Sequence, residues 1–69
     1  MKKNLKLASL RVGLGLTQEE LAKELEISTV HMNNIERNVR TPSLKLAIKI
    51  SECLGQSVNY IWEGEIINE

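Results

Sequence analysis

Residues 18–37, QEELAKELEISTVHMNNIER, carry the strongest local signals in this 69-residue chain. Two residues here favour a helix start. Thr17 directly precedes the segment, and Ser28 begins its second half. Glu20 lies three residues after Thr17 and completes a capping box. The apolar residues recur at helical spacing: Leu21, Ala22, Leu25, Met32 and Ile35. We therefore predict two short helices joined by a tight turn.

The second of these helices has a face without permanent charge. It consists of Thr29, Val30, His31, Asn33 and Asn34, which lie between the two apolar anchors. Exposed helix faces are usually rich in Lys and Glu. Asn makes paired hydrogen bonds to adenine, and methyl groups contact thymine, so this face suits the reading of base edges. Val30 fits equally well as a residue that supports the turn.

The charges are unevenly placed, although nine basic and nine acidic residues give a net charge of zero. Basic residues predominate in residues 1–11 and 28–49, whereas acidic residues predominate in residues 12–27 and from residue 50 onward. Binding to phosphate needs cations close to the reading surface. The segment that begins at the uncharged helix supplies such cations, so the sequence is compatible with a nucleic-acid partner.

Composition limits the other classes of function. The length allows one domain, residues 1–69, and a core without Phe must be aliphatic. No apolar run reaches the roughly 20 residues that span a bilayer, and residues 1–10 do not resemble a signal peptide, so we expect a cytoplasmic protein. His31 is the only histidine, and Cys53, expected to be buried or half-buried, is the only cysteine. We predict no metal site, no cofactor and no enzymatic activity, since a catalytic thiol needs a base beside it.

Turn and capping signals predict three further helices. A first helix is expected at about residues 5–14, and a fifth at about residues 58–62. Thr41 and Pro42 are expected to cap and begin the fourth helix, which ends at Gly55. Its inward-facing residues are expected to be Leu44, Ala47, Ile48, Ser51 and Leu54. The prediction is a compact all-α domain of five helices with a short C-terminal tail.

Four short stretches of this sequence resemble the Cro/cI-type (Xre) helix-turn-helix family. They are LTQEELA at residues 16–22, IERN at 35–38, RTPSL at 40–44 and LGQS at 54–57. The resemblance extends from about residue 7 to residue 62 and implies a lambda-repressor-like DNA-binding domain with its motif at residues 18–37. Glu26 and Asn38 stand where the family often has Gly. If Glu26 is left-handed, it costs about 1 kcal/mol.

The resemblance also implies roles for individual residues. Thr29, Val30 and Asn34 would face base edges, with Asn33 at the margin between bases and phosphates. The residues implied to lie along the DNA backbone are Thr17, Gln18, Ser28, Arg37, Arg40, Thr41 and Ser43. Gln18 would hydrogen-bond a phosphate beside the helix N-terminus. Arg11 and Glu36 match a structural ion pair that ties the first helix to the end of the third.

The C-terminal region, about residues 55–69, has two interpretations. In the first, the region is an end of the chain that folds onto the core. In the second, it is a dimer contact, which forms either by packing of apolar side chains or through a small hairpin. The predicted contact residues are Val58, Ile61, Trp62 and Ile66. Exposed apolar side chains favour association, and a twofold homodimer would place two reading helices about 34 Å apart on an inverted repeat. We therefore prefer the dimer contact.

The sequence predicts a dimeric regulator of transcription that binds double-stranded DNA, and of the two directions of regulation it favours repression. Two alternatives remain. One is an antitoxin or protein-interaction module that holds a regulatory protein partner. The other is a controller that activates as well as represses, in which Glu19 offers an acidic contact to RNA polymerase.

Overall fold

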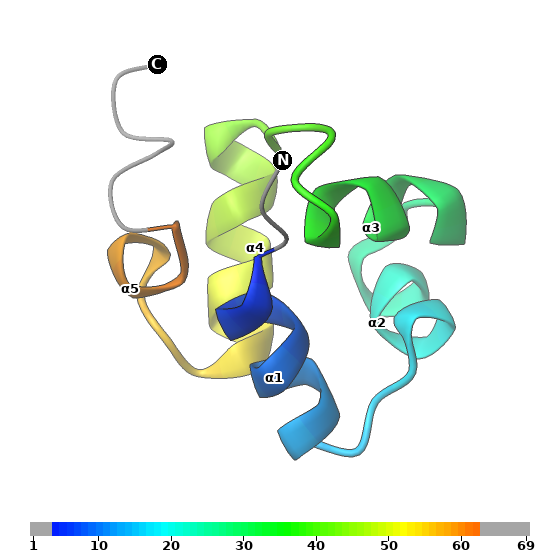
Figure 1. Ribbon diagram of the computed structural model, residues 1–69, viewed down its shortest axis with the longest axis horizontal. Helices are drawn as coiled ribbons and strands as arrows, with labels where there is room; N and C mark the ends of the chain where they lie inside the picture. The colour runs from blue at the N-terminus through cyan, green and yellow to red at the C-terminus, as the bar shows by residue number, and fades with distance from the viewer. Residues whose placement is uncertain (1–3, 63–69) are drawn as a thin grey trace.

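The computed structural model describes residues 4–62, which form five α-helices and no strand. The helices are α1 (Leu5–Gly13), α2 (Gln18–Leu25), α3 (Thr29–Glu36), α4 (Leu44–Leu54) and α5 (Val58–Trp62). α4 runs through the middle of the molecule, with α5 on one side and the α2–α3 pair on the other (Figure 1). The predicted all-α fold of five helices is confirmed.

Each helix begins at a side chain that accepts a backbone hydrogen bond. The capping residues are Asn4, Thr17, Ser28, Ser43 and Ser57. At α2 the capping box is complete, because Glu20 N donates to Thr17 Oγ1 at 3.0 Å and Thr17 N donates to Glu20 Oε1 at 2.8 Å. These short-range bonds satisfy N–H groups that a helix start leaves without a partner.

The predicted start of α4 at Thr41 and Pro42 is wrong. Ser43 is the N-cap, and its hydroxyl accepts from Leu46 N at 3.2 Å. Pro42 lies before the helix and is buried. Ser caps a helix at least as well as Thr, so local preference does not distinguish the two sites. The choice falls on Ser43 because Pro42 is buried as part of the connecting loop.

The core is made of aliphatic side chains and one indole. Its members are Leu7, Leu21, Ala22, Leu25, Met32, Ile35, Ala47, Ile50, Leu54, Ile61 and Trp62. Leu44 and Ile48 were expected inside, yet they are 47% and 43% exposed. The buried side of α4 is centred on Ala47 and Leu54, and Ile48 points about 100° away from Ala47 around the helix. Ile50 takes the inward position instead.

Within residues 4–62, two residues other than Gly adopt the left-handed conformation, and both stand where the family that the sequence resembles often has Gly. Glu26 has φ 61° and ends α2, while Asn38 has φ 63° and follows α3. At the first of these sites the chain reverses within two residues, with Ile27 N donating to Ala22 O at 3.0 Å. This turn lets α3 pack across α2.

The short helix α5 closes the core. Ile61 and Trp62 are each 2% exposed, so the expectation that Trp62 is an exposed dimer contact is wrong for this chain. A core without Phe has room for the indole. Asn4 Nδ2 donates to Ile61 O at 3.2 Å and joins α5 to the start of α1. Val58 is half-buried, and Ile66, like the proposed tail hairpin, lies outside the described residues.

Across residues 4–62, every helix falls short of the length and apolar character needed to cross a membrane.

Candidate nucleic-acid interface

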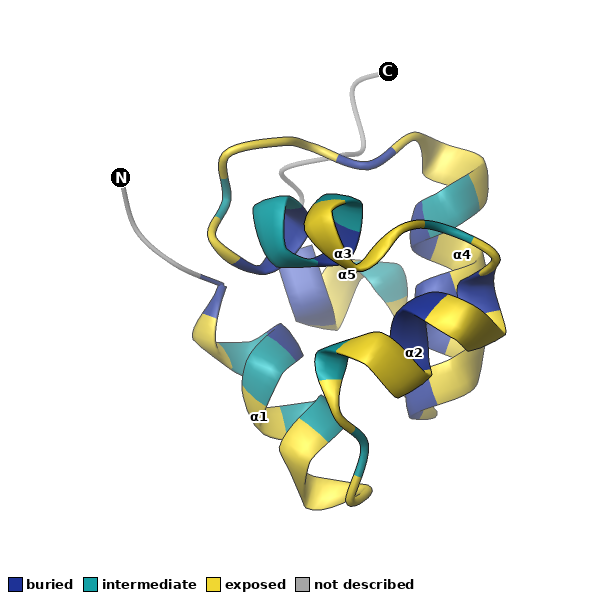
Figure 2. Cartoon of the chain, turned by 90° about the vertical axis from the view of Figure 1, so that its right-hand side faces the viewer, coloured by how far each residue is buried: buried dark blue, intermediate teal, exposed yellow. Residues whose placement is uncertain are grey.

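The uncharged face of α3 lies on the surface of the molecule. Thr29 and Val30 are exposed, and the Val30 side chain is 70% exposed, so Val30 is not packed under the turn. Met32 and Ile35 are fully buried and anchor the opposite side of the helix. Figure 2, which views the molecule from the α2–α3 side, shows exposed residues on α2 and on part of α3, whose remaining outward residues are half-buried. α3 is therefore held by its apolar side and presents its amide and methyl groups outward.

Asn33 and Asn34 are half-buried at the edge of this face. Both side chains follow directly from the helical register set by Met32 and Ile35, which lie on either side of them in sequence. Partial burial restricts a side chain and lowers the entropy that binding would cost. Amides held in this way suit the directional hydrogen bonds of base recognition.

A hollow of about 260 Å³ lies beside the N-terminal half of α3. Its lining residues are Ser28, Val30, His31, Asn34 and Arg40. Arg40 belongs to the loop after α3, and the backbone explains why it reaches this place. Val39 N and Arg40 N both donate to Asn34 O, at 2.9 and 3.2 Å. The hollow thus combines a methyl group, an amide and a cation. From the sequence we expected the methyl group and the amide to contact bases and the cation to contact the DNA backbone.

Most of the residues expected along the DNA backbone are exposed, namely Thr17, Ser28, Arg37, Arg40, Thr41 and Ser43, while Gln18 is half-buried. Ser28 and Arg40 line the hollow beside α3. Thr17, Ser28 and Ser43 are also N-caps, and each capping hydroxyl accepts one backbone N–H while its own O–H remains a donor. The N-termini of α2, α3 and α4 add further backbone N–H groups that favour anions. These cations, hydroxyl groups and helix ends are donors that suit phosphate.

The ion pair between Arg11 and Glu36 is confirmed. Arg11 Nε donates to Glu36 Oε2 at 2.6 Å, and Arg11 Nη2 donates to Glu36 Oε1 at 3.2 Å. Arg11 Nη1 also donates to Leu16 O at 2.7 Å, and Glu36 is only 5% exposed. The pair therefore joins α1, the α1–α2 loop and the end of α3. Its two parallel hydrogen bonds give the geometry that a buried ion pair needs.

Gln18, the first residue of α2, is linked to this pair. Gln18 Nε2 donates to Glu36 Oε1 at 3.0 Å, and Asn33 Nδ2 donates to Gln18 Oε1 at 3.2 Å. From the sequence alone we expected Gln18 to contact a phosphate and predicted neither of these two hydrogen bonds. Only the family resemblance pointed toward these two contacts, because it places the start of the second helix close to the third helix. Gln18 and Asn33 are 15 positions apart, which is beyond the reach of helical periodicity.

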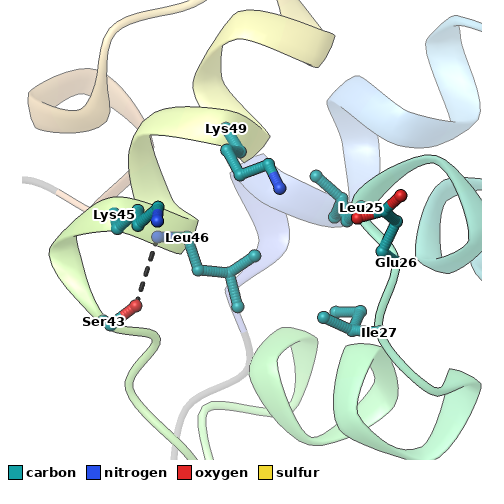
Figure 3. Close-up of a pocket in the computed structure, with 7 residues that line it drawn as sticks. All are labelled: Leu25, Glu26, Ile27, Ser43, Lys45, Leu46 and Lys49. Carbon is teal, nitrogen blue, oxygen red and sulfur yellow. Dashed lines mark hydrogen bonds between the residues drawn. The ribbon is translucent and has the colours of Figure 1, made fainter.

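A second hollow, of about 250 Å³, lies between the α2–α3 turn and the first half of α4 (Figure 3). Its lining residues are Leu25, Glu26, Ile27, Ser43, Lys45, Leu46 and Lys49. Lys45 and Lys49 are exposed and lie one turn apart on α4. No role had been assigned to them, although their spacing of four residues in a basic segment was visible. They add positive charge close to Ser43, one of the expected backbone contacts.

Cys53 is exposed, which corrects the expectation of a buried or half-buried thiol. Partial burial, together with the charges of Glu24 and Glu52, raises the pKa of the Cys53 thiol. A raised pKa keeps the thiol protonated at neutral pH, whereas nucleophilic chemistry needs the thiolate. Within residues 4–62, no group of three or more His, Cys, Asp or Glu side chains is arranged to hold a metal ion.

Comparison with known proteins agrees with this geometry. A family model described as helix-turn-helix matches residues 7–61. An HTH-type transcriptional regulator of Methanocaldococcus jannaschii, MJ0272, is 42% identical over 52 residues, which cover 72% of this chain and 79% of that protein. The HTH-type transcriptional regulator YqaF of Bacillus subtilis is 37% identical over 59 residues, covering 86% of this chain and 76% of YqaF.

A third relative, the HTH-type transcriptional regulator RC0668 of Rickettsia conorii, is 27% identical over 59 residues, and the match covers only 47% of its length. The family match spans α1 to α5 and includes the α2–α3 pair whose outward face carries the amide and methyl groups. The chain therefore belongs to the Cro/cI-type (Xre) helix-turn-helix family of DNA-binding transcriptional regulators.

Proposed function

We propose that this protein represses transcription as a homodimer that occupies a specific operator in double-stranded DNA. The observation that carries the proposal is the hollow beside α3, where Val30, Asn34 and Arg40 come together. A methyl group and an amide there suit base edges in the major groove. A cation on the same hollow suits the adjacent phosphate. One short helix and the loop after it thus supply both kinds of contact.

In the proposed complex, α3 enters the major groove. The base-reading residues are Thr29, Val30, Asn33 and Asn34, and the phosphate contacts come from Thr17, Gln18, Ser28, Arg37, Arg40, Thr41 and Ser43. The phosphate contacts set the register and the orientation of α3, while the base contacts supply the sequence preference. Gln18 keeps one amide hydrogen for a phosphate beyond the bond that it donates to Glu36.

A second copy is part of the proposal because one reading helix contacts few base pairs. We place the dimer contact in residues 55–69, with Val58 and Ile66 as its candidate residues. Ile61 and Trp62 support that region from inside the core. Tyr60 strengthens the proposal, because it is 48% exposed on the same short helix. A twofold arrangement would place two copies of α3 about 34 Å apart on an inverted repeat.

Selection of bound duplexes from a random DNA pool tests the proposal. We expect an inverted repeat whose half-site centres lie about one helical turn apart. A reporter whose promoter overlaps that repeat should lose output when the protein is present. Titration of the protein with the selected duplex should shift the NMR signals of Thr29, Val30 and Asn34. Unmoved signals at these three residues, or an enriched pool without sequence preference, would contradict base reading by α3.

Analytical ultracentrifugation with and without the selected duplex tests the second copy separately. We expect the free protein to form dimers and two chains to bind each inverted repeat cooperatively. A monomeric protein that fills the two half-sites independently would contradict the dimer. Raised reporter output would contradict repression while leaving DNA binding intact.

A further inference from the structure

We infer that Gln18 is a positioning residue that sets the orientation of the Asn33 amide on the reading face. The inference rests on the proposed function, since it concerns how α3 would read a base pair. It assigns to Gln18 a role that acts through Asn33, in addition to any contact with phosphate. The result is a chain of four side chains that leads from a buried ion pair to the DNA-facing surface.

The chain starts at a group with a fixed charge and a fixed position. The Glu36 carboxylate is 5% exposed and is held by two hydrogen bonds from the Arg11 guanidinium. An ionised carboxylate only accepts hydrogen bonds. The Gln18 atom that lies 3.0 Å from Glu36 Oε1 must therefore be the donor Nε2. The ion pair thus determines which way round the Gln18 amide lies.

The orientation of the Gln18 amide in turn determines the orientation of the Asn33 amide. With Nε2 directed at Glu36, Gln18 presents Oε1 to Asn33, and an oxygen acceptor requires a donor opposite it. Asn33 Nδ2 supplies that donor at 3.2 Å. Of the four combinations of the two amide orientations, only this one makes both hydrogen bonds. Asn33 Oδ1 is therefore not the atom that faces Gln18.

This orientation predicts what Asn33 recognises. With one Nδ2 hydrogen donated to Gln18, Asn33 offers Oδ1 as an acceptor and keeps its second Nδ2 hydrogen as a donor. In the major groove, adenine presents N6 as a donor beside N7 as an acceptor, cytosine presents only a donor, and guanine presents two acceptors. We therefore expect Asn33 to prefer adenine at one position of each half-site, because adenine matches both atoms that Asn33 offers.

A replacement of Gln18 by Met tests this role. Met keeps the length of the side chain and removes both amide atoms. Lys23→Met is the control, because Lys23 is an exposed long side chain on the same helix and lies outside the proposed DNA and dimer contacts. Binding is measured on the selected site and on duplexes with each alternative base at every half-site position. In Gln18→Met the preference at the Asn33 position should fall about five- to tenfold. Loss of the proposed phosphate contact should weaken binding to all duplexes alike, so the preferences at other positions should not change. Lys23→Met should keep the base preferences of the wild type.

A double-mutant cycle separates positioning from a direct contact. If Gln18 acts through Asn33, Gln18→Met has no further effect on base preference in the Asn33→Ala background. Equal weakening by Gln18→Met on all duplexes would make Gln18 a phosphate ligand only and would overturn the inference. An unchanged base preference in Gln18→Met would also overturn it. Thermal unfolding of each variant checks that the fold is intact.

A measurement without DNA keeps this inference separate from the proposed function. In the free protein, the Asn33 Nδ2 signals should shift in Gln18→Met and stay in place in Lys23→Met. Unshifted Asn33 signals would refute the link between the two amides even if the protein binds its operator tightly. A wild-type protein without any DNA preference would refute the proposed function, while the Asn33 signals would still report on the link.

Discussion

Asn34 and Arg40 line the same hollow but differ in what they recognise. Asn34 offers a donor and an acceptor in fixed geometry, which suits one base edge. Replacement of Asn34 by Ala should weaken binding to the selected site by about 1–3 kcal/mol and relax the preference at one base pair. Gel-shift titration on matched and mismatched duplexes measures both effects. Ser9→Ala, at an exposed position on α1, is the control, and equal loss on random DNA would contradict base reading.

Arg40 carries a charge and no base-specific geometry. Arg40→Ala should weaken binding to all sequences alike and reduce the slope of log affinity against log salt by about 1. The measurement is a titration of selected and random duplexes at several salt concentrations. Lys23→Ala removes a cation from the exposed side of α2 and should leave the slope unchanged. A loss restricted to the selected site would place Arg40 on a base instead.

The turn between α2 and α3 contains a testable strain. Glu26 is left-handed, with φ 61°, and a side chain in that conformation costs about 1 kcal/mol. Glu26→Gly should therefore raise the free energy of unfolding by about 1 kcal/mol, because Gly adopts this conformation without the steric penalty. Urea unfolding measures the change.

The same substitution two residues earlier provides the control for the turn. Glu24 is exposed inside α2, where Gly lowers helix stability by about 1 kcal/mol. Glu24→Gly and Glu26→Gly remove the same charge and the same side chain, so only the backbone conformation differs. Opposite signs are expected, and a decrease in stability for both variants would rule out the strain at Glu26.

At the scale of the whole molecule, a small core makes each large side chain important. A domain of this size buries only about 60% of its unfolded surface. Trp62 is 2% exposed and is the largest side chain of the core. Trp62→Ala should lower the free energy of unfolding by about 3–5 kcal/mol, which is a large part of the stability of such a domain.

The location of Trp62 decides how that loss depends on protein concentration. A core residue destabilises the single chain, so the loss measured by urea unfolding should be the same at low and high protein concentration. A residue at a dimer contact would instead give a loss that grows with concentration. Leu44→Ala is the comparison, because Leu44 is 47% exposed and should cost much less. A similar loss for both variants would contradict the assignment of Trp62 to the core.

Much of the fold was predictable because helix signals act over three or four residues. Thr17 and Ser28 were identified as caps from sequence, and both accept the expected backbone hydrogen bonds. Asn38 stands where the family often has Gly, and it adopts the left-handed conformation that Gly favours. The outward face of α3 also followed from local spacing, since Met32 and Ile35 turn its other side to the core.

Other features depended on contacts between distant segments, which local spacing does not encode. Thr41 and Ser43 are both good caps, and the packing of the loop around Pro42 selected Ser43. Trp62 belongs to the core because the other helices leave room for an indole. The link from Glu36 through Gln18 to Asn33 exists because the packing of α2 against α3 brings residues 15 and 18 positions apart into contact. The hydrogen bonds at the helix starts could thus be predicted from the sequence, because both partners lie within three residues of each other. The partners of the buried polar side chains could not, because only the packing of the helices brings those residues together.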